Sequence, residues 1–512
     1  MHDVLVIGAG TAGCVLASRL SDDPRCRVML VEAGPRDRKL EVRIPAAFSK
    51  LFGSKLDWGY RTTSQGALDD RRLVYPRGRL LGGSAAINAM MALRGHRSDY
   101  EPWPQSWQWE TVERLYAKSS PEFAVTQPAT PSPMALAFCE TAARVLAITR
   151  RDDLNDPDND GVGLTPLSIR DGARWSVVDG YLRPVLKRPN LTLETGTTVH
   201  RLLFEGKRVT GALGSTGREL RELRARTVVL AGGSIGSPAI LLRSGIGPAA
   251  ELARHGIDRH VESAGVGANL RDHLANGVLV ETRPGVTTLA SAETIPNVLR
   301  WLLRKQGPLT SNVAEAAAFV RTDPTLAAPD LELIFAPVPF ENEGTTKPSF
   351  DGFTVATVLL QPKSVGSVRL ASSDPAAAPL IDPGFLTDPD GDDHRLVRYG
   401  IRLARTIAGT APLAGFAAKE RLPGPELTTD DELATHVRAV SQTLYHPVGT
   451  CRMGDDPASV VDPELRVRGV DGLRVVDASV IPTLPRGHTN WPAVIVAERG
   501  AELLALGSDP RE

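Results

Sequence analysis

The segment GAGTAG at residues 8–13 constrains the fold most, because it lies between an apolar, β-branched run at 3–7 and a helical pattern. In that position Gly8 permits a tight turn, Gly10 lets the backbone approach a pyrophosphate, and Gly13 allows close packing of helix on strand. The amides at the start of the helix, with the positive end of its dipole, attract phosphate groups. The segment therefore predicts a dinucleotide site in a parallel α/β domain.

The next apolar run, at 28–31, ends in Glu32, which follows Gly13 by 19 residues. A carboxylate at this place accepts hydrogen bonds from both hydroxyls of an adenosine ribose and repels a 2′-phosphate, so an NADP-type ligand is disfavoured. A glycine turn that binds nothing is the alternative, and the order strand, turn, helix, strand argues against it. The motif alone does not separate FAD from NAD.

The chain is long and electrically balanced, with 512 residues, 59 basic and 60 acidic side chains and a net charge of −1. The length predicts more than one domain. Because the charges balance, we expect no general attraction to nucleic acid or to an anionic membrane, and neither as a partner.

The cysteines and the apolar runs indicate the cellular compartment of the protein. Four cysteines lie far apart without a CxxC pair, and reduced thiols in a cytoplasmic protein are the simplest interpretation. The first predicted strand leaves no room for a signal peptide before it. The longest uncharged runs are shorter than the ~20 residues that span a bilayer. We therefore expect a soluble cytoplasmic protein without membrane insertion.

Further apolar runs at 227–231 and 473–476, and a helical pattern at 491–506, are typical of the same α/β domain. Between them, apolar and polar residues alternate, which is typical of an antiparallel sheet with one solvated or ligand-facing side. The alternating stretches are 277–282, 316–320, 331–336, 353–361 and 366–370. We predict a nucleotide-binding domain built from separated segments, with a mostly β domain inserted between them.

The stretch LYHPVGTCRMG at 444–454 places His446 close to Cys451 and Met453. His446 is either a metal ligand, a catalytic base or a packed core histidine. One histidine, one cysteine and one methionine do not make a closed metal site without further ligands, so no metal is expected. An imidazole with a pKa near neutrality is well suited to act as a general base.

Three further stretches carry a family resemblance. They are YPRGRLLGGSAAINAMMALRGHRSDY at 75–100, LAGGSIGSPAILLRSGIGP at 230–248, and YHPVGTCRMG followed by VVDASVIPTLPRGHTNWPAVIVAERGAELL at 475–504. With GAGTAG and VEAGP they resemble the glucose–methanol–choline (GMC) oxidoreductase family over residues 4–504. Within the family, the sequence most resembles bacterial choline dehydrogenase-like and alcohol dehydrogenase-like members.

The resemblance implies an α/β fold with a Rossmann-like FAD-binding domain and an inserted, mostly antiparallel β-sheet substrate domain. It places the FAD-binding domain at 1–100, 186–275 and 440–512, and the substrate-binding domain at 101–185 and 276–439. It also implies oxidation of an alcohol, most simply a primary alcohol, to an aldehyde by hydride transfer to flavin N5. The electrons then pass to O2 or another acceptor. A flavoenzyme of the same fold with lyase or decarboxylase chemistry is the alternative.

The same resemblance assigns the cofactor residues by position. Those at the AMP half are Gly8, Gly10, Thr11, Ala12, Gly13, Glu32 and Val199, and those along the flavin, its ribityl chain and the pyrophosphate are Gly83, Ser84, Asn88, Met91, Asp477, Ala478, Asn490 and Pro492. Members with a covalent flavin carry histidine where this chain has Ile87, so we expect non-covalent FAD. At the position of Ala85 the family usually has a hydroxyl residue or glycine. Alanine there would cost at most one hydrogen bond beside the flavin.

The family places a catalytic histidine in an HP motif and a second His or Asn about 44 residues later, which here are His446 and Asn490, 44 residues apart. Asn490 would donate an N–H to the substrate oxygen. It is also a candidate helix cap, and His488, on the same side of an extended segment, is the rival for its role. We expect the other histidines at 96, 273 and 436 to lie on the surface or in loops. Trp58 and the segment 335–340 are candidate pocket walls.

Overall fold

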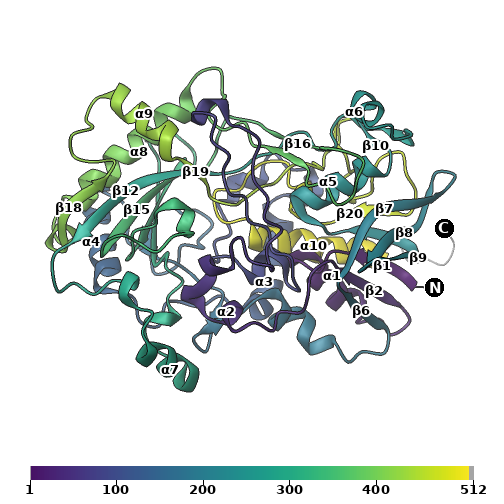
Figure 1. The fold of residues 1–512 in the computed structure, drawn as a ribbon, viewed down its shortest axis with the longest axis horizontal. Coiled ribbons are helices and arrows are strands. Elements are labelled where there is room, and N and C mark those ends of the chain that lie inside the picture. The colour runs from purple at the N-terminus through teal and green to yellow at the C-terminus, as the bar shows by residue number, and fades with distance from the viewer. Residues whose placement is uncertain (1, 507–512) are drawn as a thin grey trace.

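The structure is a computed structural model that describes residues 2–506. Two seven-stranded sheets organise it, and they lie side by side along the long axis of the molecule (Figure 1). One sheet is mostly parallel and the other antiparallel. The predicted α/β fold with an antiparallel sheet inserted is therefore confirmed.

The first sheet is built around the strand that precedes the glycine turn. In its parallel part Val4 pairs with Val28 on one side and with Thr227 on the other, so segments distant in sequence become neighbours. The strands are β1 (His2–Ile7), β2 (Val28–Glu32), β6 (Leu191–Thr195), β9 (Glu219–Leu230) and β20 (Leu473–Val475), with β7 (Thr197–Glu205) and β8 (Arg208–Thr216) added antiparallel. The four strands expected at 3–7, 28–31, 227–231 and 473–476 are confirmed.

Two helices from opposite ends of the chain pack together on this sheet, α1 (Thr11–Leu20) and α10 (Asn490–Leu506). The predicted helix at 491–506 is confirmed. Helix α10 is apolar nearly all round because it is largely buried, with α1 and α3 (Trp109–Phe123) packed against it. A further helix, α5 (Gly233–Arg243), follows β9 and begins at the second glycine-rich stretch.

The second sheet has the strand order β18-β12-β15-β14-β13-β3, with β19 added to β12. Its strands are β3 (Gly161–Leu164), β12 (Leu274–Thr282), β13 (Ala316–Val320), β14 (Leu331–Ala336), β15 (Gly352–Leu359), β18 (Ala417–Leu422) and β19 (Gln442–Thr443). Helices α4 (Pro133–Leu146) and α8 (Asp392–Ala408) pack against it. Four of the five alternating stretches form this sheet as predicted.

The fifth stretch, 366–370, is not part of the large sheet. It forms β16 (Ser367–Arg369), which pairs with β17 (Leu380–Asp382) in a separate two-stranded sheet. Pro362 lies between β15 and β16, and because proline has no amide hydrogen the chain leaves the large sheet there. The predicted domain boundaries stay a prediction, and α3 packs in the same core as the first sheet.

The remaining helices and paired strands are α2 (Leu40–Arg43), α6 (Ala249–Arg254), α7 (Ile295–Arg304), α9 (Asp430–Val440), β4 (Ile169–Arg170) with β5 (Ala173–Arg174), and β10 (Ile246–Gly247) with β11 (Val261–Glu262). Helix α7 projects from the lower edge of the molecule in Figure 1. Within residues 2–506, no helix combines the length and the apolar character needed to cross a bilayer.

Candidate active site

A cavity of about 1200 Å³ lies between the two large sheets, with walls from both. From the first sheet come the carboxyl ends of three parallel strands, at Ile7, Val31 and Ala231. From the second come mostly alternate residues of β12, β14 and β15, namely Ala275, Gly277, Leu279, Ile334, Ala336, Thr354 and Ala356, together with Asn276. The second sheet therefore has the ligand-facing side that its alternation predicts, and its other face packs on helices.

The first glycine turn combines tight packing with an open face. Gly8 has φ +104°, and a Cβ on it would lie 2.5 Å from the Ala231 carbonyl oxygen. A Cβ on Gly13 would lie 1.9 Å from the Gly8 oxygen, whereas one on Gly10 would meet nothing closer than 3.9 Å. Gly8 and Gly10 line the cavity. Because no side chain caps the start of α1, its first amides are available to an anion.

Glu32 is buried at the end of β2 and ties the turn to the strand. One carboxylate oxygen accepts the Ala9 amide at 2.9 Å and the other accepts the Gly34 amide at 2.8 Å. Burial raises the pKa of Glu32 to about 7, although these amides and Arg79 act in the opposite direction. Each oxygen keeps a further lone pair with which to accept a ligand hydroxyl.

A second glycine turn opens onto the same cavity at the start of α5. Its Gly233 amide donates to Asp477 Oδ2 at 2.8 Å, and the Ser237 hydroxyl donates to the same oxygen at 2.6 Å. Asp477 follows β20, so this carboxylate joins the ends of two neighbouring strands. Burial raises its pKa. The structure thus places two helix N-termini on one cavity.

Most of the predicted cofactor residues lie on this cavity. Those that line it are Gly8, Gly10, Thr11, Ala12, Glu32, Gly83, Ser84, Asn88, Met91, Val199, Asp477, Ala478 and Asn490. Gly13 and Pro492 do not, and Gly13 serves the packing of α1 on the turn instead. Ile87 and Trp58 are cavity walls, and of the segment 335–340 Ala336 and Phe340 are walls while Phe335 is buried in the core of the second sheet.

His446 belongs to a chain of hydrogen bonds that begins at a backbone carbonyl. The Leu360 oxygen lies 3.1 Å from His273 Nε2, and His273 Nδ1 lies 2.9 Å from His446 Nδ1. A carbonyl oxygen only accepts, so His273 Nε2 carries the proton. In a neutral His273 the Nδ1 atom is then an acceptor, and the proton between the rings belongs to His446 Nδ1. His446 Nε2 is left with a free lone pair.

Burial keeps both rings neutral. Desolvation lowers the pKa of His273 to about 3, with repulsion from His488 adding to the effect. The pKa of His446 is lowered well below its ordinary value, first by burial and then by His488, His273 and Arg77. Since His446 lines the cavity, a neutral imidazole meets whatever the cavity holds.

The backbone of His446 is held by the residue next to His273. The His446 amide donates to Asp272 Oδ1 at 2.7 Å, while Tyr75 and Thr443 donate their hydroxyls to Asp272 Oδ2 at 2.5 and 2.6 Å. Asp272 and His273 therefore fix the main chain and the ring of His446 together.

Asn490 and His488 complete the site from the start of α10. The Thr11 hydroxyl donates to Asn490 Oδ1 at 2.7 Å, which leaves the Asn490 amide group free to donate. The Ala493 amide bonds to the Thr489 oxygen, so the first helical carbonyl comes from the residue before Asn490. His488 lies with its ring centroid 4.6 Å from that of His446, and its Nε2 is 3.3 Å from Glu332 Oε1.

One expectation about side chains changes in part. Of the histidines at 96, 273 and 436, expected on the surface or in loops, His96 and His273 do lie outside helices and strands and His436 lies in α9, but all three are buried, with 3%, 0% and 8% exposed. Their polar sequence neighbours gave the wrong indication, because Asp272 points its carboxylate at His446 and not at solvent. Sequence reasoning did not place His273 in the candidate site, where it contacts His446, and its place directly before the buried strand β12 was the available signal. Cys451 and Met453 pack in the core of the first sheet.

Comparisons with known proteins show the family and the fold. Family models described as GMC oxidoreductase match residues 2–275 and 362–497. The alcohol dehydrogenase (acceptor) of Pseudomonas putida is 37% identical over 99% of this chain and 96% of that protein. The oxygen-dependent choline dehydrogenase of Brucella ovis is 36% identical, with the same coverage of each chain. The crystal structure of pyridoxine 4-oxidase from Mesorbium loti matches with a TM-score of 0.90 at 32% identity, covering 99% of both chains.

Proposed function

The chain belongs to the GMC oxidoreductase family, and from this premise we propose that it oxidises a primary alcohol to an aldehyde, with FAD bound in the cavity and His446 as the base. The observation that carries the proposal is the hydrogen-bond chain from Leu360 through His273, which leaves His446 Nε2 unprotonated in the cavity. O2 or another acceptor would then take the electrons.

The residues on the cavity suit FAD. The glycine turn before α1 presents an uncapped helix N-terminus that favours a pyrophosphate, and Glu32 offers carboxylate oxygens to ribose hydroxyls. Ile87 has no atom that could bond to a flavin, which supports non-covalent binding. FAD, when bound, supplies the acceptor for a hydride from the alcohol carbon. The four cysteines are free thiols, which suits the cytoplasmic setting that the sequence predicts.

The protein's own part in the reaction is to hold the alcohol and take its proton. His446 Nε2 accepts the hydroxyl proton, so that the alkoxide character of the oxygen drives the hydride away from carbon. Asn490, whose oxygen is occupied by Thr11, donates an N–H to the same oxygen and stabilises its developing negative charge. The proton thus moves to the ring while carbon and oxygen form the aldehyde.

Replacing the two residues separately tests this proposal. Anaerobic stopped-flow bleaching of the flavin by an alcohol should slow by about 10²–10⁴-fold in His446→Ala, because a general base is lost. Asn490→Ala should cost about 10–10³-fold, because one hydrogen bond to the oxygen is lost. FAD content and the unfolding temperature should stay near those of the wild type in both.

His96→Asn is the matched control, because His96 is also buried but does not line the cavity. It should bleach at the wild-type rate. A normal rate in His446→Ala would reject His446 as the base and direct attention to His488. Absence of bleaching by every alcohol tried with the wild-type protein would favour the alternative chemistry of a lyase or decarboxylase.

A further inference from the structure

Helix α7 presents an apolar stripe to solvent. Ile295, Leu299, Leu302 and Leu303 are 78%, 50%, 42% and 82% exposed, and their spacing places them on one side of the helix. Ordinary surface helices bury such a stripe and expose their polar side. Here the arrangement is reversed, so the stripe is available to a partner.

The opposite side of α7 is firmly attached to the protein. Trp301 is 1% exposed, donates its indole N–H to the Gly172 oxygen at 2.8 Å, and packs in a small cluster with Ile44 and Ala47. Thr294 caps the helix by accepting the Asn297 amide. The outward direction of the leucines is therefore set by anchored contacts.

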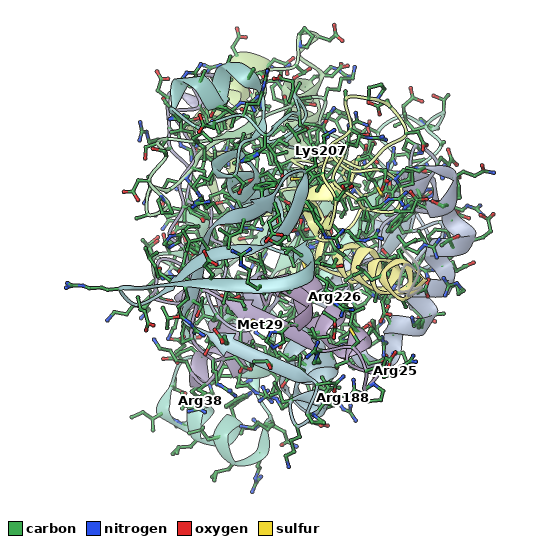
Figure 2. All side chains as sticks on the ribbon, turned by 90° about the vertical axis from the view of Figure 1, so that its right-hand side faces the viewer. Arg25, Met29, Arg38, Arg188, Lys207 and Arg226 are labelled. Atoms are coloured by element: carbon green, nitrogen blue, oxygen red, sulfur yellow. The ribbon has the colours of Figure 1, made fainter. Side chains whose placement is uncertain are left out.

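Two arginines lie on the polar side of α7: Arg300 borders the stripe, three residues before Leu303, and Arg304 follows Arg300 one turn later. Arg300 and Arg304 are exposed, and neither forms an ion pair with any residue that the structure describes. The nearby acid Glu293 is already paired with Lys50 at 2.6 Å. Three of the four arginines labelled in Figure 2 do form ion pairs: Arg25, Arg188 and Arg226 pair with Asp23, Asp22 and Asp3. The end of α7 is thus locally basic although the whole chain is close to neutral.

We propose that α7 docks on the surface of an anionic phospholipid membrane, with its leucines in the interfacial layer and its arginines on the lipid headgroups. An apolar stripe bordered by arginines is the pattern of helices that lie in a membrane interface. The helix projects from the edge of the molecule, as a flat bilayer surface requires (Figure 1). A second copy of the chain fits less well, because a two-fold contact through the stripe would bring the like-charged arginines of both copies together.

Docking would also place the wall of the cavity near the bilayer. Ile44 and Ala47 pack against Trp301 of α7, while Phe48 and Phe52 in the same segment line the cavity. One short stretch of chain therefore separates the membrane-facing helix from the proposed alcohol site. This inference concerns where the enzyme works and does not depend on which alcohol it oxidises.

Vesicle sedimentation of the FAD-loaded full-length protein tests the proposal. The wild type should sediment with vesicles of phosphatidylcholine containing about one third phosphatidylglycerol, and much less with phosphatidylcholine alone. Leu299→Gln with Leu303→Gln should lower the bound fraction roughly tenfold, because the apolar contact is lost. Arg300→Gln with Arg304→Gln should remove the preference for anionic vesicles and the sensitivity to salt.

Matched controls are available elsewhere on the surface. Leu220→Gln replaces a leucine that is 62% exposed on β9, and Arg218→Gln replaces an exposed arginine beside it. Both should bind vesicles like the wild type. No sedimentation of the wild type with anionic vesicles at low salt would overturn the proposal. So would equal effects of test and control variants, or a dimer in analytical ultracentrifugation that the leucine substitutions abolish.

Discussion

At the residue scale, the ring nitrogen of His446 that carries the proton is determined by the backbone carbonyl of Leu360, which acts through His273. The Leu360 carbonyl selects the tautomer of His273, and His273 in turn selects that of His446. Neither His273 nor Leu360 needs to touch a substrate for this to matter. His273 is therefore a positioning residue, because in an unconstrained imidazole the proton distributes between both nitrogens.

Removing the acceptor on His273 should expose this role. In His273→Leu, His446 Nδ1 loses its partner, and flavin bleaching should slow by roughly 10–100-fold, the range for the loss of a group that orients a histidine. His273→Asn, whose side-chain oxygen can accept from His446 Nδ1, should recover part of the rate. Equal rates in both variants with unchanged FAD content would show that the ring only fills space.

The lowered pKa of His446 predicts the pH dependence of the reaction. The neutral ring is the active form, and a pKa below the ordinary value of 6.5 keeps it neutral as the pH falls through 6.5. The bleaching rate at saturating alcohol should therefore change less than about twofold between about pH 8 and pH 6.5, and decline only at lower pH. If the bleaching rate instead fell with a midpoint near pH 6.5, the ordinary pKa of histidine, the His446 ring would be exposed to water in the complex with alcohol.

At the element scale, the glycine turn before α1 carries two separate requirements. Gly13 is needed for packing, because a Cβ there would meet the Gly8 oxygen at 1.9 Å. Gly10 has φ −78° and free space around it, so the protein alone tolerates a side chain there. Only a ligand approaching the backbone at Gly10 requires glycine.

A pair of alanine substitutions separates these requirements. Gly13→Ala should lower the unfolding temperature of the FAD-free protein, since overpacking costs about 1–3 kcal/mol. Gly10→Ala should leave that temperature unchanged and weaken FAD binding by roughly tenfold or more, about 1.4 kcal/mol. Scanning fluorimetry of the FAD-free proteins and an FAD titration measure both. Unimpaired FAD binding in Gly10→Ala would place the pyrophosphate elsewhere.

At the scale of the whole molecule, the cavity is assembled from segments that are remote in sequence. Its walls include residues from the segments 8–12, 83–91, 231–236, 477–478 and 488–490 around the first sheet, and from strands of the second. A ligand that fills this space contacts both sheets. Its binding therefore stabilises the fold of the entire chain and not of one element.

Two measurements follow for the FAD-loaded protein. Acid precipitation should release all the yellow colour into the supernatant, because Ile87 offers no site for a covalent bond. Adding FAD at about 100 times its dissociation constant to the stripped protein should contribute about 2.7 kcal/mol and raise the unfolding temperature by about 2–3 °C. Colour retained on the pellet, or an unfolding temperature indifferent to FAD, would contradict non-covalent binding across the cavity.

The sequence by itself determined the features that depend on neighbouring residues. The strand, glycine turn and helix at 3–20, the acid at Glu32, and most strands of both sheets could be predicted because local spacing dictates which face each side chain takes. The pairing of His446 with Asn490 came from motif order in a family resemblance.

Only the tertiary structure decided the contacts between distant segments. His273 lies 173 residues from His446 in the chain, and no local pattern records that their rings meet. The same holds for α7. Its amphipathic spacing can be predicted from the sequence, but the sequence does not show which side of the helix faces solvent. The covered face of α7 is the one that carries Trp301, because Trp301 packs against Ile44 and Ala47, which are distant in sequence.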